Sequence, residues 1–244
     1  MVAPPRERLD LALVRRGLAE TRERAHALIL SGAVKVDGCS ATRPAQAVPT
    51  TAAVVVAQQG PDYVSRGALK LERALDTWPI DPTGKVALDV GASTGGFTEL
   101  VLTRGATKVF AVDVGYGQLH YKLRTDPRVV SLERTNIRHL TELPEQAQLG
   151  VVDVSFISLK LALPPMFRLV TDEIVALIKP QFEAGRAQVG KGGVVRNPHV
   201  HQQVIDDLQA WSQMQPWRLT ETVESPIKGP AGNVEFLSHW LPEG

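Results

Sequence analysis

Residues 86–100 constrain the fold of this chain more than any other stretch. They open with a short apolar run, 86–90, typical of a buried parallel strand. A glycine-rich turn follows, and then a helical apolar pattern that ends at Gly105. A second apolar strand, 109–112, ends in Asp113. This order of strand, glycine turn, helix, strand and acid predicts the nucleotide-binding half of a doubly wound α/β sheet.

The spacing of the turn favours one class of ligand. It reads Asp89-x-Gly91-x-x-x-Gly95-Gly96, which does not match the G-x-G-x-x-G pattern that seats a pyrophosphate on a helix. The charge of Asp89 disfavours a phosphate and favours a cation or an amino group. S-adenosylmethionine has no phosphate and carries both an amino group and a sulfonium, and Asp113 is placed to accept hydrogen bonds from its ribose. We therefore favour a methyl donor over NAD, with plain turn glycines as the alternative.

The same stretch resembles the Asp-x-Gly-Ala-x-x-Gly-Gly-Phe segment of FtsJ-like RNA 2′-O-methyltransferases. The resemblance implies a Rossmann-like class I methyltransferase domain with a seven-stranded, mostly parallel sheet and S-adenosylmethionine as its cofactor. The cofactor-binding residues that it implies are Asp89, Gly91, Ser93, Thr94, Gly95, Gly96, Phe97, Asp113 and Asn136.

The bulk composition describes an ordinary globular protein. At 244 residues the chain can hold one large domain, or a medium domain and a small one. No apolar run is long enough to span a membrane, and the N-terminus lacks the apolar core of a signal peptide. The single cysteine, Cys39, predicts neither an internal disulfide nor a metal cluster. We expect a cytoplasmic protein.

Charge is unevenly distributed along the chain. Residues 1–60 contain eight Lys/Arg and five Asp/Glu, a net charge of +3, whereas the whole chain carries +1. A small basic module therefore precedes a larger, slightly acidic one, which favours an anionic partner for the first part. The turn-rich residues 58–62 mark the boundary. We expect domains over 1–60 and 65–244, joined by a linker at 61–64.

The first module has clear helix and strand signals. Apolar spacing predicts a helix over 7–16, and Thr21 is placed to cap a second helix that ends before Gly32. Residues 33–36 alternate as a strand and precede an Asp-Gly turn, and residues 48–57 predict a further strand.

This pattern, from Arg8-Leu9-Asp10 to Val36-Asp37-Gly38, resembles the S4 domain, a small RNA-binding module. Its arginines are either a solvated face or contacts to RNA phosphates, and with the S4 spacing we favour RNA. Arg8-Leu9-Asp10 also resembles the catalytic Arg-Leu-Asp of pseudouridine synthases, but it lies inside the module's first helix, so we interpret it as structural. The candidate RNA-binding residues are Arg8, Arg15, Arg16, Arg22, Arg24 and, in the second domain, Arg66.

The second domain alternates strands and helices, which predicts a parallel sheet, and ends in strands that suit an antiparallel addition. Ser65 is placed to cap a first helix that buries Leu71, Leu75 and Trp78. Asn197, followed by a proline, caps a helix that runs to about residue 212. The strands expected after Asp113 are 129–132, 149–154, 174–178, 217–223 and 234–240.

Two signals for other functions are rejected. Residues 185–191 match most of a phosphate-binding P-loop, but Gly192 replaces the Ser/Thr that binds magnesium, and residues 193–198 cannot open a helix there. His199 and His201 are two apart on a helix and therefore point to different sides, so they do not form a metal site. We expect no NTPase activity and no metal.

Four charged residues are expected to converge beside the methyl donor. Asp153 and Lys179 end neighbouring strands, where a doubly wound sheet has its crevice, and Lys70 and Glu235 are within reach of it. A ribose 2′-hydroxyl is a weak acid, so methylation requires a base. A lysine amine serves as base when burial and a neighbouring cation favour its neutral form.

These four residues resemble the Lys-Asp-Lys-Glu tetrad of FtsJ-like enzymes. The resemblance implies that Lys179 is the proton acceptor. With the S4 domain and the segments Asp-Val-Ser-Phe-Ile-Ser and Lys-Pro-Gln-Phe-Glu, the chain resembles the TlyA family, often labelled haemolysin A. That resemblance implies 2′-O-methylation of cytidine in ribosomal RNA, with free RNA or a ribosomal subunit as the partner. The tail after Glu235 is short, as in the shorter type of this family, which acts on 23S RNA only. We therefore expect 23S RNA as the target, with 16S RNA as a second target.

Two other function classes stay open. The first is a non-catalytic RNA-binding protein on a methyltransferase scaffold, which the intact turn and tetrad disfavour. The second is a membrane-active haemolysin, disfavoured by the absence of an export signal, a spanning segment or a basic amphipathic helix. We expect no membrane partner and favour a monomer.

Overall fold

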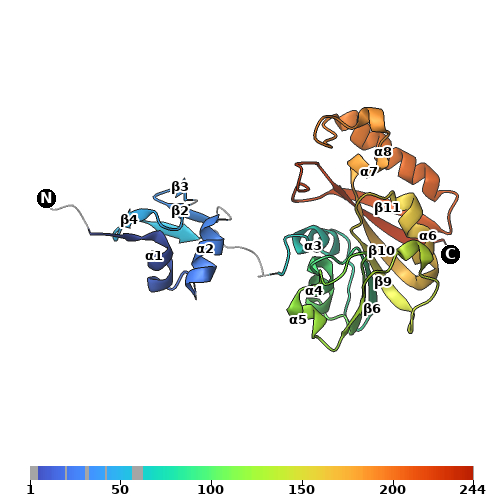
Figure 1. The fold of residues 1–244 in the computed structure, drawn as a ribbon. Coiled ribbons are helices and arrows are strands. Elements are labelled where there is room, and N and C mark those ends of the chain that lie inside the picture. The colour runs from blue at the N-terminus through green and yellow to red at the C-terminus, as the bar shows by residue number, and fades with distance from the viewer. Residues whose placement is uncertain (1–4, 20, 31–32, 42, 57–62, 244) are drawn as a thin grey trace. The chain divides into compact units, whose positions relative to one another are not determined.

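The computed structural model describes residues 5–19, 21–30, 33–41, 43–56 and 63–243. The chain divides after Asp62 into two compact units, Met1–Asp62 and Tyr63–Gly244, each with its own hydrophobic core (Figure 1). The expected linker at 61–64 falls partly on residues 57–62, which lie outside the described residues.

The first unit packs two helices against short strands. Helices α1 (Leu9–Arg15) and α2 (Arg22–Leu30) share a core with Val34 and Val48. Strand β1 (Arg6–Arg8) pairs with β4 (Ala47–Pro49), and β2 (Val34–Val36) pairs with β3 (Cys39–Ser40) and β5 (Val54–Val56).

Two predictions for this unit are wrong at their boundaries. The first helix begins at Leu9 rather than residue 7, because Arg6–Arg8 pairs with Ala47–Pro49 as a strand. The expected strand over 48–57 is two strands. The N–H of Ala52 donates to the carbonyl of Pro49 (3.0 Å) and turns the chain between them.

The second unit contains the predicted seven-stranded, mostly parallel sheet, in the order β11-β12-β10-β9-β6-β7-β8. Neighbours from β10 to β8 are parallel, whereas β12 is antiparallel to both β10 and β11. The expected antiparallel addition at the end of the chain is therefore confirmed. The strands are β6 (Val86–Val90), β7 (Lys108–Val112), β8 (Val129–Leu132), β9 (Ala147–Val152), β10 (Val170–Ile178), β11 (Trp217–Glu224) and β12 (Phe236–Pro242).

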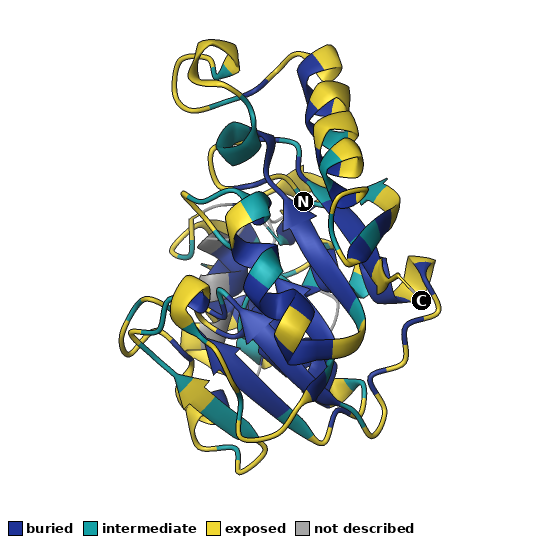
Figure 2. Cartoon of the chain, turned by 90° about the vertical axis from the view of Figure 1, so that its right-hand side faces the viewer, coloured by how far each residue is buried: buried dark blue, intermediate teal, exposed yellow. Residues whose placement is uncertain are grey.

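Helices cover both faces of this sheet, which is why its central strands are apolar throughout. Alternate residues of β6 enter different cores: Val86 and Leu88 face one, and Ala87 faces the other. Figure 2 shows the strands as a buried layer. One face is covered by α3 (Ala68–Thr77), α4 (Gly96–Thr103) and α5 (Tyr121–Arg124), and the other by α6 (Leu159–Leu169) and α8 (Pro198–Ser212). Short helices α7 (Pro180–Glu183), η1 (Ile137–His139) and η2 (Arg186–Gln188) lie in the connections.

Helix boundaries were predicted unevenly. The α8 prediction is confirmed: the Asn197 side chain accepts from the N–H of His199 (3.0 Å) and Pro198 is its first residue. The expected cap at Ser65 is wrong, because α3 begins at Ala68 and Ser65 Oγ accepts from Gly67 N–H instead (3.0 Å). Helix α6 was not predicted, since it contains two consecutive prolines.

Candidate active site

The site lies where the strand order reverses. Strand β6 has β7 on one side and β9 on the other, so connections leave in opposite directions and open a crevice at the carboxyl ends of the strands. Val90 pairs with Val152, which brings Gly91 next to Asp153. A Cβ on Gly91 would lie 2.3 Å from the Asp153 carbonyl oxygen, and its φ is +83°. Only glycine fits here, so the turn follows from backbone packing as well as from ligand access.

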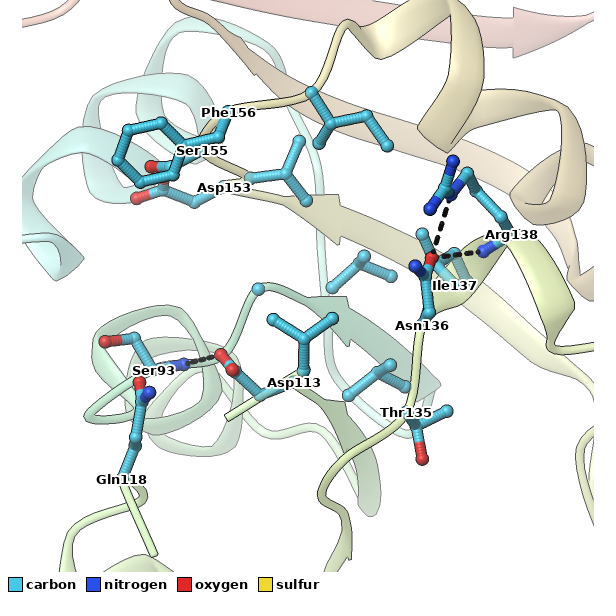
Figure 3. Close-up of a pocket in the computed structure, with 16 residues that line it drawn as sticks. Ser93, Asp113, Gln118, Thr135, Asn136, Ile137, Arg138, Asp153, Ser155 and Phe156 are labelled. Carbon is cyan, nitrogen blue, oxygen red and sulfur yellow. Dashed lines mark hydrogen bonds between the residues drawn. The ribbon is translucent and has the colours of Figure 1, made fainter. Parts of the chain in front are cut away.

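A cavity of about 410 Å³ occupies this crevice (Figure 3). Four predicted cofactor residues line it: Gly91, Ser93, Asp113 and Asn136. Its walls are partly apolar, with Val90, Val112, Val114, Ile137, Val154 and Ile157. Figure 3 shows Ser93, Asp113 and Gln118 on one wall and Asp153, Ser155 and Phe156 on the facing wall.

Backbone donors hold the Asp113 carboxylate in place. Its Oδ2 accepts from the N–H of Ser93 (2.8 Å) and its Oδ1 from the N–H of Gly115 (2.7 Å). Each oxygen keeps a lone pair for a further donor such as a ribose hydroxyl. Asn136 Oδ1 accepts from the backbone N–H of Arg138 (3.1 Å), which leaves the amide nitrogen of Asn136 available to a base.

A smaller cavity of about 100 Å³ adjoins the glycine turn. It is lined by Gly91, Ser93, Thr94, Gly96, Phe97 and Asp153, together with Ser65 and Gly67. Gly95 lines neither cavity: its φ is +100°, and a Cβ there would lie 2.2 Å from Leu123 Cδ1. The structure thus gives Gly95 a packing role, and the expected contact of Gly95 with the cofactor stays a prediction.

Asp89 is a buried carboxyl with a free oxygen. It is fully buried; its Oδ2 accepts from Thr98 Oγ1 (2.6 Å), and its Oδ1 has no hydrogen-bond partner among the described residues. The pKa of Asp89 is raised to about 7, mainly by burial and also by the neighbouring Asp153 carboxylate, while the hydrogen bond from Thr98 lowers it. A cation beside Asp89 would favour its charged form.

The four tetrad residues form two lysine–carboxylate pairs, of which Lys70–Glu235 is buried and Lys179–Asp153 is partly buried. Lys70 Nζ lies 2.6 Å from Glu235 Oε2, and Lys179 Nζ lies 2.6 Å from Asp153 Oδ1. Lys179 also donates to Ser155 Oγ (2.8 Å). Both lysines and Glu235 are more than nine-tenths buried.

Strand register brings the two pairs to the same edge of the sheet. Asp153 follows β9, Lys179 follows β10, and Glu235 precedes β12, whose first residue, Phe236, pairs with Ile178. Lys70 reaches Glu235 from helix α3, which contacts β12. Lys70 is therefore a buried member of the group and not a surface lysine.

In the first unit the candidate arginines are paired with acids. Asp10 is fully buried and receives hydrogen bonds from Arg8 (2.8 Å), Arg22 (2.9 Å) and His26 (2.9 Å). The hydrogen bond from Arg8 is the largest cause that lowers the pKa of Asp10. Asp10 therefore organises the two helices, which agrees with the structural interpretation of Arg8-Leu9-Asp10.

The arginines differ in their accessibility. The side chains of Arg8, Arg15 and Arg22 remain 43%, 58% and 52% exposed, and each can still meet a phosphate. Arg16 instead donates to the carbonyls of Ala52 (2.7 Å) and Thr50 (2.9 Å), so the fold itself uses its guanidinium. Arg66 is exposed, whereas the side chain of Arg24 lies outside the described residues.

The two segments that carried the rejected signals are both described in the structure. Residues 185–191 contain the short helix η2 and no P-loop helix. His201 is buried and bonds to the Val195 carbonyl (3.0 Å), while His199 is exposed. No group of His, Cys, Asp or Glu suited to a metal occurs among the described residues. Within the same residues, no helix is long and apolar enough to cross a bilayer.

Some residues of the site were not predicted. Ser155 contacts Lys179, Gln118 and Thr135 line the cavity, and Phe156 is 90% exposed at its mouth. Ser155 and Phe156 belong to the Asp-Val-Ser-Phe-Ile-Ser segment already singled out, so their place after a strand end was the available signal. Gln118 and Thr135 lie in loops with no recognisable pattern.

Comparisons with known proteins agree with this geometry. A family model described as FtsJ-like methyltransferase matches residues 63–240, and an S4 domain model matches residues 7–54. The 16S/23S rRNA (cytidine-2′-O)-methyltransferase TlyA of Mycobacterium tuberculosis is 49% identical over 243 residues, covering 97% of this chain and 90% of that protein. Hemolysin A of Brachyspira hyodysenteriae is 40% identical over 239 residues, covering 96% of this chain and 99% of that protein.

A solved structure gives the same result for the fold. It is the structure of a Streptococcus thermophilus protein that is described as a hemolysin. It is 39% identical and covers 98% of this chain and 90% of its own, with a TM-score of 0.76.

Proposed function

The chain belongs to the FtsJ-like methyltransferases and to their S4-containing TlyA family, and we propose that it methylates a cytidine 2′-hydroxyl in ribosomal RNA. S-adenosylmethionine is the cofactor of this family. The observation that carries the proposal is the pair of lysine–carboxylate contacts at the carboxyl edge of the sheet, where Asp153 also lines the cavity. Lysines are seldom buried, and two of them with matched acids beside a ligand cavity indicate proton chemistry.

The cavity suits the cofactor in its chemistry. Apolar walls accommodate an adenine, and the Asp113 carboxylate is oriented by two backbone donors to accept from ribose hydroxyls. The free oxygen of buried Asp89 supplies negative charge toward a cationic group. Thus Asp113, Asn136 and Asp89 are the residues that would hold S-adenosylmethionine, which brings an electrophilic methyl group to the site.

Each member of the tetrad has a distinct role in the proposal. Lys179, as the neutral amine, accepts the proton of the 2′-hydroxyl on Nζ. Asp153 and Ser155 orient the Nζ atom of Lys179 and stabilise the ammonium group that forms when it accepts the proton. Lys70, held in place as an ammonium by its ion pair with Glu235, supplies a positive charge that stabilises the developing alkoxide.

The names of relatives support the choice of target RNA. The Mycobacterium tuberculosis protein is named for both 16S and 23S RNA, and we propose 23S RNA as the main target here with 16S as the second. The exposed side chains of Arg8, Arg15 and Arg22 hold RNA through the first unit. A ribosomal substrate also implies action in the cytoplasm.

Incubation of the protein with radiolabelled S-adenosylmethionine and either isolated large or small ribosomal subunits tests the proposal. We expect incorporation into RNA that blocks alkaline cleavage after one cytidine, and none with Lys179→Ala. Binding of RNA without incorporation into either subunit or free ribosomal RNA would support the scaffold alternative and refute the enzyme assignment.

A further inference from the structure

The glycine-rich segment between α7 and α8 forms a narrow turn rather than a P-loop. The N–H of Gly190 donates to the carbonyl of Val194 (3.1 Å), and the N–H of Gly193 donates to that of Gly190 (3.1 Å). Gly192 and Gly193 have φ of +80° and +74°, with open space around each. The glycines therefore serve the backbone conformation, and they present Lys191 at the tip of the turn.

Buried side chains fix this turn to the catalytic edge of the sheet. Asn233, only 2% exposed, donates from Nδ2 to the carbonyl of Gly193 (2.9 Å) and accepts on Oδ1 from the N–H of Val195 (2.9 Å). His201 bonds to the carbonyl of Val195 (3.0 Å). Because Asn233 lies two residues before Glu235, these hydrogen bonds fix the position of the turn relative to that tetrad residue.

The loop before β12 approaches the same place. Gly229 donates its N–H to the Asn233 carbonyl (2.9 Å), and a Cβ on Gly229 would lie 2.3 Å from Glu235 Oε1. Its neighbour in sequence, Lys228, is exposed, so the loop that contacts Glu235 also carries a solvent-accessible cation.

Four exposed cations lie on these two segments. Arg186 belongs to the short helix η2, and the other three, Lys191, Arg196 and Lys228, are called here the cationic rim. Residues 184–204 and 225–234 contain no Asp or Glu. Within the described part of the chain no carboxylate pairs with any of the three. At the opposite edge of the sheet, in contrast, Lys108 pairs with Glu145 and Arg128 with Asp126.

The rim and the tetrad lie on the same side of the cofactor cavity. The cofactor cavity lies over the ends of β6, β7, β8 and β9, whereas the rim belongs to the loops after β10 and before β12. A ribose that reaches Lys179 beside a filled cavity must therefore bring its chain past the rim. Each ribose in an RNA strand carries a phosphate on either side.

We propose that the cationic rim binds the phosphodiester backbone of the RNA strand next to the methylated nucleotide. This inference rests on the proposed function and adds a second RNA-binding element, on the methyltransferase unit, to the S4 domain. A free nucleoside triphosphate is a poorer fit, because Gly192 stands where a P-loop has the Ser/Thr that binds magnesium. Cations on short anchored loops suit a polyanion that passes along the surface.

The test compares two triple variants of the full chain. Lys191→Ala/Arg196→Ala/Lys228→Ala removes the rim, and Lys108→Ala/Arg128→Ala/Arg168→Ala removes the same charge at the far edge. Affinity for 23S RNA is measured between 50 and 300 mM salt, and single-turnover methylation is measured at rising RNA concentrations. The rim variant should bind at least tenfold more weakly at 100 mM salt. Its salt slope should fall by about 2, from three lost contacts of about 0.7 each.

The remaining readouts separate phosphate binding from other roles. S-adenosylmethionine affinity and the methylation rate at saturating RNA should stay within twofold of the unaltered chain. The charge-conserving variant Lys191→Arg/Arg196→Lys/Lys228→Arg should keep the salt slope. An unchanged slope in the rim variant, or an equal loss in the far-edge variant, would overturn the inference. Failure of the unaltered chain to methylate any ribosomal RNA while its RNA affinity still depends on the rim would instead overturn the proposed function alone.

Discussion

Replacing Asp89 with asparagine tests the electrostatics of the glycine turn. The carboxyl is fully buried, and only one of its oxygens has a hydrogen-bond partner among the described residues. Asparagine keeps the shape and the acceptor for Thr98 Oγ1 but cannot ionise. The variant therefore isolates the effect of one buried charge on folding and on cofactor binding.

The expected size follows from the pKa. Burial raises the pKa of Asp89 from 3.8 to about 7, so the folded protein holds a proton that the unfolded chain loses above pH 4. Stability should then fall as pH rises from about 4 to 7 and level off above 7, because the folded state binds more protons across that window. This shift of about three pKa units corresponds to about 4 kcal/mol in the free energy of unfolding. Asp89→Asn should match the unaltered protein near pH 4 and be more stable by up to about 4 kcal/mol at pH 8.

Cofactor binding should respond in the opposite sense. A cationic cofactor group near Asp89 favours the ionised carboxylate, so binding below pH 7 must release a proton. Affinity should weaken by up to tenfold per unit as pH falls from 7 to 5, a range in which an α-amino group stays charged. Asp89→Asn should lose this pH dependence and bind more weakly at pH 8.

Urea unfolding of the methyltransferase unit from pH 4 to 8, and calorimetry in two buffers of different ionisation enthalpy, measure these effects. The control is Thr98→Val, which removes the hydrogen bond to Asp89 and should raise its pKa further. A cofactor affinity that is flat from pH 5 to 8, with no proton released on binding, would refute the assignment of Asp89 to the cofactor. Equal stabilities of Asp89→Asn and the unaltered protein at pH 8 would refute the burial argument.

Three further predictions concern the other parts of the site. Lys179→Ala should keep cofactor affinity within a fewfold but abolish single-turnover methylation, and Lys179→Arg should not restore it, because guanidinium does not release its proton near neutral pH; substantial turnover in Lys179→Arg would mean that another group takes the proton. Asp113→Ala should weaken S-adenosylmethionine binding in calorimetry at least tenfold, about 1.4 kcal/mol, and an unchanged affinity would remove the ribose assignment. A protein truncated to begin at Asp62 should still bind the cofactor but lose affinity for ribosomal RNA, which filter binding would contradict if both lengths bound equally.

The sheet was predictable because its signals are local. A parallel strand buried on both faces is a run of apolar residues, and β6 and β8 match their predicted bounds. Helix α6 was not predicted, because two consecutive prolines, Pro164 and Pro165, normally interrupt a helix. Its first residue follows Ser158, whose Oγ accepts from the N–H of Lys160 (3.1 Å), and burial of its apolar face against the sheet outweighs the backbone bonds that proline removes.

The site was predictable in its members but not in its pairing. Asp153 and Lys179 could be placed at the crevice because both follow strands. The pairing of acids with lysines depends on contacts between elements that are far apart in the sequence. Lys70 and Glu235, for example, are separated by 165 residues. The hydrogen bonds from Arg16 to the carbonyls of Thr50 and Ala52 could not be predicted either. A surface arginine and a structural arginine have the same sequence pattern.

The antiparallel strand β12 explains why the fourth tetrad residue precedes its strand while two others follow theirs. In a parallel set, only residues after a strand reach the carboxyl edge of the sheet. A strand that runs the other way brings its first residues to that edge, and Phe236 pairs there with Ile178. Glu235 therefore reaches the crevice without a helical crossover. The loop that precedes it passes over the same edge, so one strand reversal places both the carboxylate partner of Lys70 and the cation of Lys228 beside the substrate's path.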